Sequence, residues 1–465
     1  MIRLFRVFIP ASTVALAVSE IILLYLSFVL VAFMVLEVDP EYFLVYDGGL
    51  FRITGAVFSI VIGLYFQDLY DDLRIMSRIR VVQQFVMAVG IAFLVQAIST
   101  YVNHQLILPR WMMIYASMFI VVLVPAWRVN FVRFVLTGDR ARLVLFMGTS
   151  PVLVELNRRL RERLELGFRV VGFVDDRNES GDTPELDGMP CLGKLSDLRA
   201  IVEKYKPERI VVGMAERRAR LPIYDLLDLR LSGIHVEEAA VLYESCFGRV
   251  STRDLRPSQL IFSSELGPSQ NSVAIQHIYS LAIALVGAIV TAPLMLLAVL
   301  LLKLTSKGPV LYKQVRVGKD GVNFHVLKFR SMYVDAEART GAVWASKNDP
   351  RITPVGRYLR KFRIDELPQF WNVLRGDMSF VGPRPERPEF VQALSEKIPF
   401  YRQRHCVRPG ITGWAQINHK YGDTVEDTIT KLEFDLYYIK NISFALDVYI
   451  ILNTLKTVML GRGAQ

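Results

Sequence analysis

Cysteine and histidine are scarce in this chain, which has three cysteines and six histidines in 465 residues. Cys191, Cys246 and Cys406 are far apart, so they form neither a disulfide framework nor a metal-binding knuckle, and they suit a reducing compartment. The histidines show no His-x-x-x-His spacing and no cluster with cysteine, which argues against a zinc site. No stretch has the pattern of a nucleic-acid-binding module. These absences argue against disulfide-stabilised, zinc-dependent and nucleic-acid-binding classes of protein.

Acidic residues are also in deficit. The 45 aspartates and glutamates stand against 55 lysines and arginines, which gives a formal net charge of +10, and 52% of the residues are hydrophobic. That hydrophobic share is above the range of ordinary soluble domains. The excess positive charge fits an anionic substrate or the anionic cytoplasmic leaflet of a membrane. We therefore expect a membrane protein of two or three domains that binds phosphate groups.

Four apolar runs occupy the first third of the chain, at residues 12–36, 50–69, 81–98 and 111–131. Each is close to the roughly 20 residues that a spanning helix needs. No small-residue cleavage site follows the first run, so we interpret it as an anchor. The loop after the first run is acidic and has no lysine or arginine, whereas arginines precede the first run, fill the second loop and follow the fourth run. The positive-inside rule then predicts that both ends of this bundle lie in the cytoplasm.

Glu20 lies inside the first apolar run. A carboxylate within a membrane segment is a candidate functional residue. This one is near the predicted cytoplasmic end, so it could instead reach the headgroups or serve in packing. The sequence leaves these alternatives open.

A small α/β unit of Rossmann type follows residue 142, where short apolar strands at 143–147, 170–174 and 210–212 alternate with helical patterns. The turn at Gly148 lacks a dinucleotide fingerprint, because Ser150 and Leu153 stand where glycines would be needed. Asp175 and Asp176 end the second strand, where an acidic residue can bind a ribose. Without the glycines, a scaffolding, oligomerisation or regulatory role is favoured over cofactor binding.

A fifth apolar segment, residues 278–302, has Pro293 in its middle. Lysines and an arginine follow it at once, which is a cytoplasmic flank by the positive-inside rule. Proline removes a backbone hydrogen bond and kinks a helix, so a re-entrant helix that enters and leaves on one face fits both facts. The alternative is a plain fifth span with a modest kink, which hydropathy alone favours. We expect the re-entrant form.

An acidic pair, Asp365 and Glu366, lies among basic residues in the C-terminal part. Apolar residues then recur at i, i+3, i+4 and i+7, which predicts a helix that starts near Asp365 with one buried face. These residues are Leu367, Phe370, Trp371 and Leu374. Pro368 would lie in the first turn, where proline is tolerated. Both carboxylates would then lie at the positive end of a helix dipole, as a simple acidic cap or as reactive groups.

Basic residues recur beside turn-forming glycine and proline in five blocks of this part. Such clusters can hold phosphate oxygens through arginine and lysine donors and through loop N–H groups. A single block of this kind is usually solvated surface, whereas five in one segment, with an acidic pair among them, favour a phosphate site. The blocks cover residues 308–321, 324–332, 348–356, 360–385 and 408–416.

The chain from about residue 277 onward closely resembles the bacterial sugar transferases, the monotopic polyprenyl-phosphate hexose-1-phosphate transferases. Asp-Glu-Leu-Pro-Gln at 365–369 and Val-Gly-Pro-Arg-Pro at 381–385 carry the resemblance. With the segments ahead of it, the whole chain is similar to the large form that initiates exopolysaccharide synthesis. The resemblance implies a membrane α plus α/β fold with an α-rich monotopic catalytic domain. The expected parts are a four-helix transmembrane domain (1–138), a Rossmann-like cytoplasmic domain (139–252), a linker (253–274) and a re-entrant helix with the catalytic domain (275–465).

The resemblance also implies a reaction. A hexose 1-phosphate would pass from a UDP-sugar, UDP-glucose or UDP-galactose, to undecaprenyl phosphate, with release of UMP and a requirement for Mg²⁺. The chain would be a multi-pass protein of the bacterial inner membrane with its catalytic domain on the cytoplasmic face, and it is compatible with a homo-oligomer.

The implied roles fall on few residues. We expect Asp365 to be the nucleophile that forms an aspartyl intermediate and Glu366 to be its partner, with both as metal ligands. Arg360 and Arg384 would bind phosphate oxygens. The prolines beside Arg384 would shape its loop, and further basic residues would contact the diphosphate or uridine. These are Pro383, Pro385, Lys328, Arg330 and Arg408. The family often has Ser-Pro at the re-entrant break, whereas this chain has Ala292-Pro293.

Two other functions are compatible with parts of the chain. A membrane-anchored nucleotide-sugar dehydratase or epimerase also combines membrane helices with a Rossmann unit, but it needs a Tyr-x-x-x-Lys pair, and this sequence contains none. A non-catalytic scaffold of a polysaccharide assembly complex would suit residues 1 to about 250. It would leave the C-terminal motifs unexplained.

Overall fold

The computed structural model describes residues 2–4, 7–36, 39–70, 77–103, 107–136, 141–176, 188–214, 221–252, 270–333, 349–419 and 424–460. The chain forms two compact units, the first mainly residues 9–149 and 153–237 and the second mainly residues 238–465. Most of the predicted linker, residues 253–269, lies outside the described residues. Its last five residues, 270–274, already belong to a long helix.

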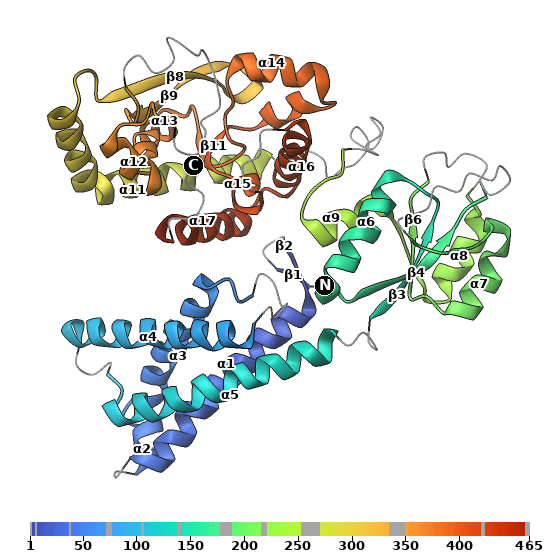
Figure 1. Cartoon of the computed structure of the whole chain (residues 1–465), viewed down its shortest axis with the longest axis horizontal. Coiled ribbons are helices and arrows are strands. Elements are labelled where there is room, and N and C mark those ends of the chain that lie inside the picture. The colour runs from blue at the N-terminus through green and yellow to red at the C-terminus, as the bar shows by residue number, and fades with distance from the viewer. Residues whose placement is uncertain are drawn as a thin grey trace. The chain divides into compact units, whose positions relative to one another are not determined.

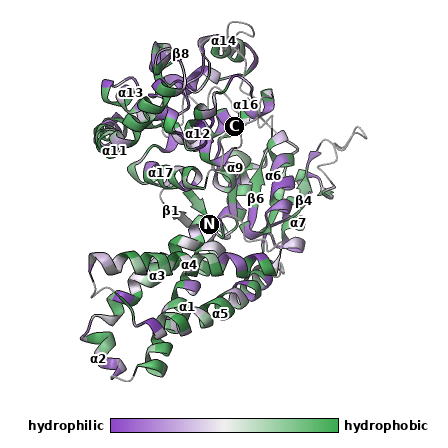
Figure 2. Cartoon of the chain, turned by 60° about the vertical axis from the view of Figure 1, so that its left-hand side comes forward, coloured by the Kyte–Doolittle hydropathy of each residue, from purple (hydrophilic) through white to green (hydrophobic). Residues whose placement is uncertain are grey.

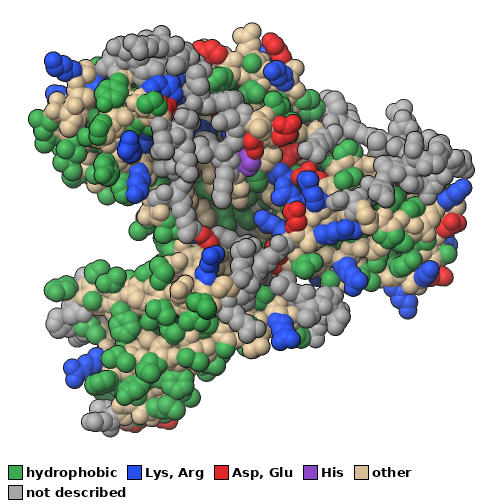
Figure 3. Space-filling view, viewed as in Figure 1, with side chains coloured by type: hydrophobic (Ala, Val, Ile, Leu, Met, Phe, Trp, Pro, Cys, Tyr) green, Lys and Arg blue, Asp and Glu red, His purple; other side chains and the backbone are tan. Residues whose placement is uncertain are grey.

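Four long helices dominate the N-terminal part of the first unit (Figure 1). Each is long and apolar enough to cross a membrane, and the most apolar stretch of each is only 28% to 44% buried. Hydrophobic side chains cover much of their visible surface (Figure 3). Such exposure is typical of a membrane protein, because soluble monomers rarely expose large apolar patches. The helices are α1 (Ala11–Val35), α3 (Gly49–Phe66), α4 (Arg78–Val102) and α5 (Arg110–Leu136), with a short α2 (Pro40–Val45) after α1. A two-stranded ribbon of β1 (Ile2–Leu4) and β2 (Val7–Ile9) precedes α1, and residues 3–8 of it belong to the second unit.

These helices pack through α1 against α3 and α5, and through α4 against α3 and α5. Leu24, Phe28 and Phe85 are fully buried in the shared core. Gly63 allows α3 and α4 to approach closely, because a Cβ atom there would lie 2.9 Å from the Cα of Ala88. Small residues of this kind are typical of helix contacts in membranes. The four predicted apolar runs therefore match four packed helices.

Glu20 lies in the core of these helices and is paired. The Arg128 side chain donates from Nε to Glu20 Oε1 and from Nη2 to Oε2, both at 2.7 Å, and Tyr70 donates to Oε2 at 2.8 Å. The remaining Nη1 of Arg128 donates to the carbonyl of Leu69. Glu20 is 0% exposed and Arg128 is 4% exposed. The network is thus internally satisfied and ties α1 to α5.

The rest of the first unit is a five-stranded sheet in the order β5-β4-β3-β6-β7, in which β3 to β6 pair in parallel. This confirms the α/β unit and places its first strand at the centre. The strands are β3 (Arg142–Met147), β4 (Phe168–Val174), β5 (Cys191–Gly193), β6 (Arg209–Val212) and β7 (His235–Glu238). The helices and 3₁₀ turns are α6 (Pro151–Glu162), η2 (Leu164–Leu166), η4 (Leu195–Asp197), α7 (Leu198–Tyr205) and α8 (Ile223–Leu231).

Gly148 follows β3 with φ +90°, and a Cβ there would lie 2.7 Å from the carbonyl oxygen of Gly213, so only glycine fits. The two acidic residues after β4 bind protein groups. Asp175 accepts a hydrogen bond from Thr149 at 3.0 Å, and Asp176 accepts one from the backbone N–H of Leu195 at 2.8 Å.

The second unit is rich in helices and contains two small two-stranded sheets. The β-hairpin of β8 (Leu311–Val317) and β9 (Asn323–Phe329) is antiparallel, and β10 (Ser379–Val381) pairs in parallel with β11 (Gly410–Thr412). The helices are α9 (Ala239–Phe247), α11 (Gln270–Thr305), α12 (Pro354–Lys361), α13 (Gln369–Arg375), α14 (Pro388–Lys397), α15 (Trp414–Asn418), α16 (Val425–Asn441) and α17 (Phe444–Met459), with 3₁₀ turns η5 (Lys319–Gly321), η6 (Ile364–Glu366) and η7 (Tyr401–Cys406).

The helix α9 packs within this second unit. Tyr243 donates to Glu433 of α16 at 3.1 Å, and the Trp414 indole donates to the carbonyl of Gly248 at 2.6 Å. The compact C-terminal unit therefore begins near residue 238, earlier than the sequence-based domain boundary.

The helix α11 runs for 36 residues with Pro293 inside it, and its ribbon bends along its length (Figure 1). Its most apolar stretch is 11% buried, the lowest value among the five apolar helices of the described chain. Hydrophobic residues predominate along it (Figure 2). An internal proline commonly bends a helix without ending it.

The Glu20 network generates a prediction about stability. Removing one partner of a buried ion pair leaves an uncompensated charge and costs about 3 to 5 kcal/mol. Glu20→Ala should therefore lower the thermal unfolding temperature of the detergent-solubilised protein markedly. Replacement of both Glu20 and Arg128 by leucine should restore most of that loss, and Glu41→Gln, at an exposed position, should have little effect. A Glu20→Ala protein as stable as the wild type would contradict this account.

Candidate active site

The acidic pair lies in the turn between two helices. Arg363 lies between α12 and η6, in the left-handed conformation with φ 52°, and it caps η6, which contains Asp365 and Glu366. Both side chains are buried, at 7% and 8% exposure. The prediction of a helix starting near Asp365 is wrong by about four residues, because α13 begins at Gln369 with Pro368 as its N-cap. The carboxylates thus lie just before the helix, in a 3₁₀ turn.

The buried face of α13 also differs from the predicted one. Trp371 is 57% exposed, whereas Asn372 and Val373 are fully buried. The Asn372 amide accepts from the backbone N–H of Leu327 at 3.0 Å and donates to the carbonyl of His325 at 2.7 Å. These are backbone groups of β9 that need partners when buried. A polar contact with β9, which periodicity of apolar residues does not reveal, therefore sets the orientation of α13.

Glu366 is the acceptor on which three basic side chains converge. Lys328 Nζ, from β9, lies 2.9 Å from Oε1, and Arg384 Nη2, from the loop after β10, lies 3.0 Å from the same oxygen. Arg363 Nη1 lies 3.3 Å from Oε2. Burial alone would raise the pKa of Glu366, but the charges of Lys328, Arg384 and Arg363 outweigh it and hold the pKa well below its usual value. Glu366 is therefore ionised.

Asp365 has the opposite electrostatic environment. Burial and the negative charge of Glu366 together raise its pKa to about 6, against the opposing charges of Lys328, Arg360 and Arg363. Within the described part of the chain, no side chain donates a hydrogen bond to Asp365, so its oxygens keep their lone pairs. Two adjacent carboxyl groups whose environments separate their pKa values are typical of divided catalytic roles.

The predicted site residues divide into two groups. The structure brings Lys328 and Arg384 onto the acidic pair, with the positive charge of Arg360 acting on Asp365. The Nη1 atom of Arg360 is buried and has no hydrogen-bond partner among the described residues, which leaves a donor for an anionic ligand. Pro383 and Pro385 flank Arg384 in its loop.

Arg330 and Arg408 bind backbone carbonyls of neighbouring elements. Arg330 donates from Nη1 to Lys307 and from Nη2 to Ser306, so it holds the end of α11. Arg408 donates from Nε to Gly376 at 3.0 Å, just after α13. Their roles in diphosphate or uridine binding stay predictions.

Sequence reasoning missed two residues that shape this centre, Arg363 and Asn372. Arg363 stands three residues before Glu366, and that spacing is a signal for a local ion pair. The contact of Asn372 with β9 is non-local and has no such signal.

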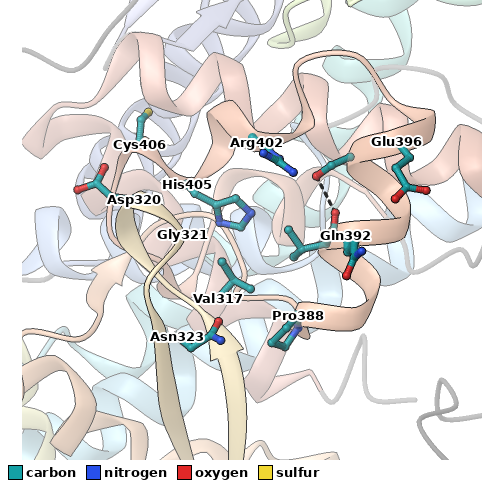
Figure 4. Close-up of a pocket in the computed structure, with 12 residues that line it drawn as sticks. Val317, Asp320, Gly321, Asn323, Pro388, Gln392, Glu396, Arg402, His405 and Cys406 are labelled. Carbon is teal, nitrogen blue, oxygen red and sulfur yellow. Dashed lines mark hydrogen bonds between the residues drawn. The ribbon is translucent and has the colours of Figure 1, made fainter.

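A separate cavity of about 760 Å³ lies between the hairpin tip, α14 and η7 (Figure 4). Asp320 and Asn323 line it from the hairpin, Gln392 from α14, and Arg402 and His405 from η7. Burial lowers the pKa of His405 to about 4, with a further contribution from Arg404, so this imidazole is neutral at pH 7. None of the predicted site residues lines the cavity.

The predicted Mg²⁺ has limited ligands at this centre. Among the described residues, no group of three or more histidine, cysteine or acidic side chains could hold a metal ion. Mg²⁺ can use one or two carboxylates together with substrate phosphates. Three basic groups already surround Glu366, so it fits poorly as a metal ligand, whereas Asp365 fits.

A buried acidic pair surrounded by basic side chains, in a unit that also carries a long exposed apolar helix, is typical of a membrane-associated protein with a charged, buried centre. Comparison with known proteins identifies it further. Residues 271–461 match the family described as bacterial sugar transferases, and residues 65–220 match a family described as a CoA-binding domain.

Three curated relatives share much of the chain. A UDP-N-acetylgalactosamine-undecaprenyl-phosphate N-acetylgalactosaminephosphotransferase of Aeromonas hydrophila is 41% identical over 61% of this chain and 63% of its own length. An undecaprenyl-phosphate glucose phosphotransferase of Komagataeibacter xylinus is 34% identical over 71% of this chain and 61% of its own length. A UDP-glucose:undecaprenyl-phosphate glucose-1-phosphate transferase of Klebsiella pneumoniae is 35% identical over 70% of both chains. The chain belongs to the bacterial sugar transferase family. Its matches span less than two thirds of the first two relatives.

The raised pKa of Asp365 predicts an unusual pH dependence of stability. In the unfolded chain this carboxyl has a pKa near 3.8, and in the folded protein near 6. The folded state therefore holds the proton more tightly, and stability is lost as the pH rises from about 4 to about 6, by up to about 3 kcal/mol. Asp365→Asn should raise the unfolding temperature at pH 8 and change it little at pH 4.

Glu396 is an exposed residue on α14, so Glu396→Gln is a suitable control. It should change the unfolding temperature little at either pH. A stabilisation by Asp365→Asn that is equal at the two pH values would show that burial of the charge is not its cause.

Proposed function

We propose that this protein transfers a hexose 1-phosphate from a UDP-sugar to undecaprenyl phosphate and releases UMP, as the first membrane step of exopolysaccharide synthesis. The observation that carries the proposal is the buried Asp365–Glu366 pair with Lys328, Arg363 and Arg384 on one carboxylate. Transfer between two anionic substrates requires charge neutralisation and positioning, which such a centre supplies. The names of the relatives support the same substrates.

Asp365 is the nucleophile in this proposal. Its ionised oxygen attacks the sugar-bearing β-phosphorus of the UDP-sugar, a P–O bond forms, and the bond to the α-phosphate oxygen breaks, so that UMP leaves with the bonding electrons. An oxygen of undecaprenyl phosphate then attacks the same phosphorus and displaces the Asp365 carboxylate. Asp365 suits this role because no described side chain donates a hydrogen bond to it and its pKa near 6 keeps it both ionised and basic at pH 7.

Glu366 holds the surrounding cations in place. Lys328 uses one of its three N–H donors on Glu366, so its other donors can bind phosphate oxygens while the ion pair remains, and Arg384 brings a second positive charge to the same carboxylate. The unpartnered Nη1 of Arg360 is a third donor. Mg²⁺, held by Asp365 and the diphosphate, would supply further charge neutralisation when bound.

The contacts of α11 support a re-entrant arrangement. Near its start, Gln276 and Tyr279 donate to Asp447 of α17. Near its end, Leu302 packs with Leu359 of α12, and Arg330 binds the two carbonyls that directly follow α11. A straight helix of 36 residues would be about 54 Å long and would separate its ends across a bilayer. Both ends of α11 instead contact one compact unit, so we place them on the same, cytoplasmic face of the inner membrane.

Exposed apolar side chains near the acidic pair fit this placement. Phe362 is 46% exposed and Trp371 57%, and in the sequence they come shortly before and shortly after η6. Apolar and aromatic groups in this position suit the headgroup region, where the phosphate of a polyprenyl lipid lies.

The sugar itself is a further proposal. UDP-glucose and UDP-galactose are the expected donors, and one relative is named for N-acetylgalactosamine. The dehydratase or epimerase alternative is not favoured, because the sequence lacks its Tyr-x-x-x-Lys pair, and a pure scaffold leaves the acidic centre unexplained.

The nucleophile assignment predicts that Asp365→Asn lowers UMP release by more than about a thousandfold, because an amide cannot form the acyl phosphate. The measurement is UMP release from each UDP-sugar with undecaprenyl phosphate, combined with rapid quench to trap a sugar-phosphate adduct on the wild type. Near-normal turnover by Asp365→Asn beside an inactive Glu366→Gln would reverse the assignment. Absence of an adduct would favour direct transfer.

The re-entrant arrangement predicts the labelling of single cysteines introduced after removal of Cys191, Cys246 and Cys406. Thr305→Cys, at the exposed end of α11, should react with a membrane-impermeant maleimide only after the cells are permeabilised. Tyr46→Cys, in the loop between α2 and α3, should react in intact cells and thus controls for access. External labelling of Thr305→Cys would establish a fifth membrane span.

A further inference from the structure

The loop that carries Arg384, residues 382–386, is held through its carbonyl groups. The carbonyl of Pro383 accepts from the N–H of Gly410 at 3.0 Å, and that of Glu386 accepts from the N–H of Val317 at 2.9 Å. Between them, the carbonyl of Arg384 accepts from Arg404 Nη2 at 2.9 Å and that of Pro385 from Arg316 Nη1 at 3.0 Å. Four successive carbonyls are thus bonded, the middle two by guanidinium groups.

Arg404 is buried behind this loop, with 6% exposure. Besides the Arg384 carbonyl, it binds the Tyr401 hydroxyl through Nη1 at 2.8 Å, and its Nη2 lies 2.8 Å from Asp435 Oδ2. Asp435, on α16, is 1% exposed. A buried guanidinium held by a buried carboxylate has little freedom to move, so it fixes the position of the carbonyl to which it donates.

A single residue, Arg384, connects Arg404 to the acidic pair. The backbone of Arg384 is held by Arg404, and the side chain of the same residue places Nη2 3.0 Å from Glu366 Oε1. Among the described residues, Arg404 contacts the carbonyl of Arg384, Tyr401 and Asp435 but neither carboxylate of the pair. Any influence of Arg404 on the centre must therefore pass through Arg384 and its loop.

We propose that Arg404, held by Asp435, is a positioning residue that acts on the sugar-phosphate transfer through Arg384. The proposal rests on the proposed function for its kinetic readout. Lysine at position 404 keeps the charge but has one ammonium, which cannot bind the loop carbonyl, Tyr401 and Asp435 with the geometry of a planar guanidinium. Misplacement of a catalytic group by about 1 Å can cost a hundredfold in rate.

The test is a double-mutant cycle of Arg404→Lys and Arg384→Ala, measured as kcat/KM for UMP release with the UDP-sugar that the wild type uses best and undecaprenyl phosphate. Arg404→Lys alone should lower kcat/KM by about tenfold or more. In the Arg384→Ala background the same change should cost less than about twofold, because its route to the centre is already lost. Asp435→Asn, a milder change, should show the same dependence on Arg384. If Arg404→Lys lowers kcat/KM by the same factor with and without Arg384→Ala, the proposal is overturned.

The matched control is Glu433→Gln on the same helix. Glu433 is 3% exposed and binds Tyr243 and the N–H of Thr252, so its loss should lower the unfolding temperature without coupling to Arg384. Hydrogen exchange gives a readout free of turnover. Arg404→Lys should speed exchange in peptides covering residues 379–388 of the full-length protein, and Glu433→Gln should not. If Arg404→Lys leaves hydrogen exchange in residues 379–388 unchanged, the positioning role is overturned. If Arg404→Lys speeds that exchange but the wild type releases no UMP, the proposed function is overturned instead.

Discussion

Three positive charges meet on one buried carboxylate, and the geometry of the C-terminal unit depends on that contact. Glu366 receives Lys328 from a strand, Arg384 from a loop and Arg363 from the preceding turn. Each of these cations would be costly to bury alone, and Glu366 would be equally costly without them. The ion cluster therefore joins elements that are distant in the sequence, and it holds the three basic side chains in place.

The adjacent carboxylate illustrates how environment divides two similar residues. Asp365 and Glu366 are neighbours in one 3₁₀ turn, and both are buried, yet their pKa values shift in opposite directions. The difference arises from partners, since Glu366 takes the hydrogen bonds of the basic groups and Asp365 feels only their field. An ionised Asp365 is thus poorly stabilised in the free protein. A buried carboxylate with few hydrogen bonds is more reactive, but its ionised form lowers the stability of the folded protein. Active sites commonly combine these two effects.

Local patterns predicted much of the fold. Four apolar runs matched α1, α3, α4 and α5 within a few residues, and the first strand of the Rossmann-like sheet was placed correctly, because length and periodicity are local properties. The acidic pair and two of its basic partners were also recognised from sequence. The start and buried face of α13 were predicted wrongly, because the amide of Asn372 binds the edge of β9 and overrides apolar periodicity. The placement of α9 depends on a contact between Tyr243 and Glu433, 190 positions apart, and the role of Arg404 depends on a contact 20 positions away. No local pattern reveals contacts of this kind.

The prolines beside Arg384 have a consequence for how anions are recognised. Glycine-rich phosphate loops surround their ligand with backbone N–H groups. In the 382–386 loop, Pro383 and Pro385 have no N–H, and the carbonyls from Pro383 to Glu386 are already bonded to the protein. The N–H of Gly382 donates to the carbonyl of Thr412, so this loop has fewer backbone donors for an anion than a glycine-rich loop of the same length. Under the proposed function, side-chain guanidinium and ammonium groups would supply most contacts to the phosphates, and selectivity among hexoses would come from other surfaces of the unit.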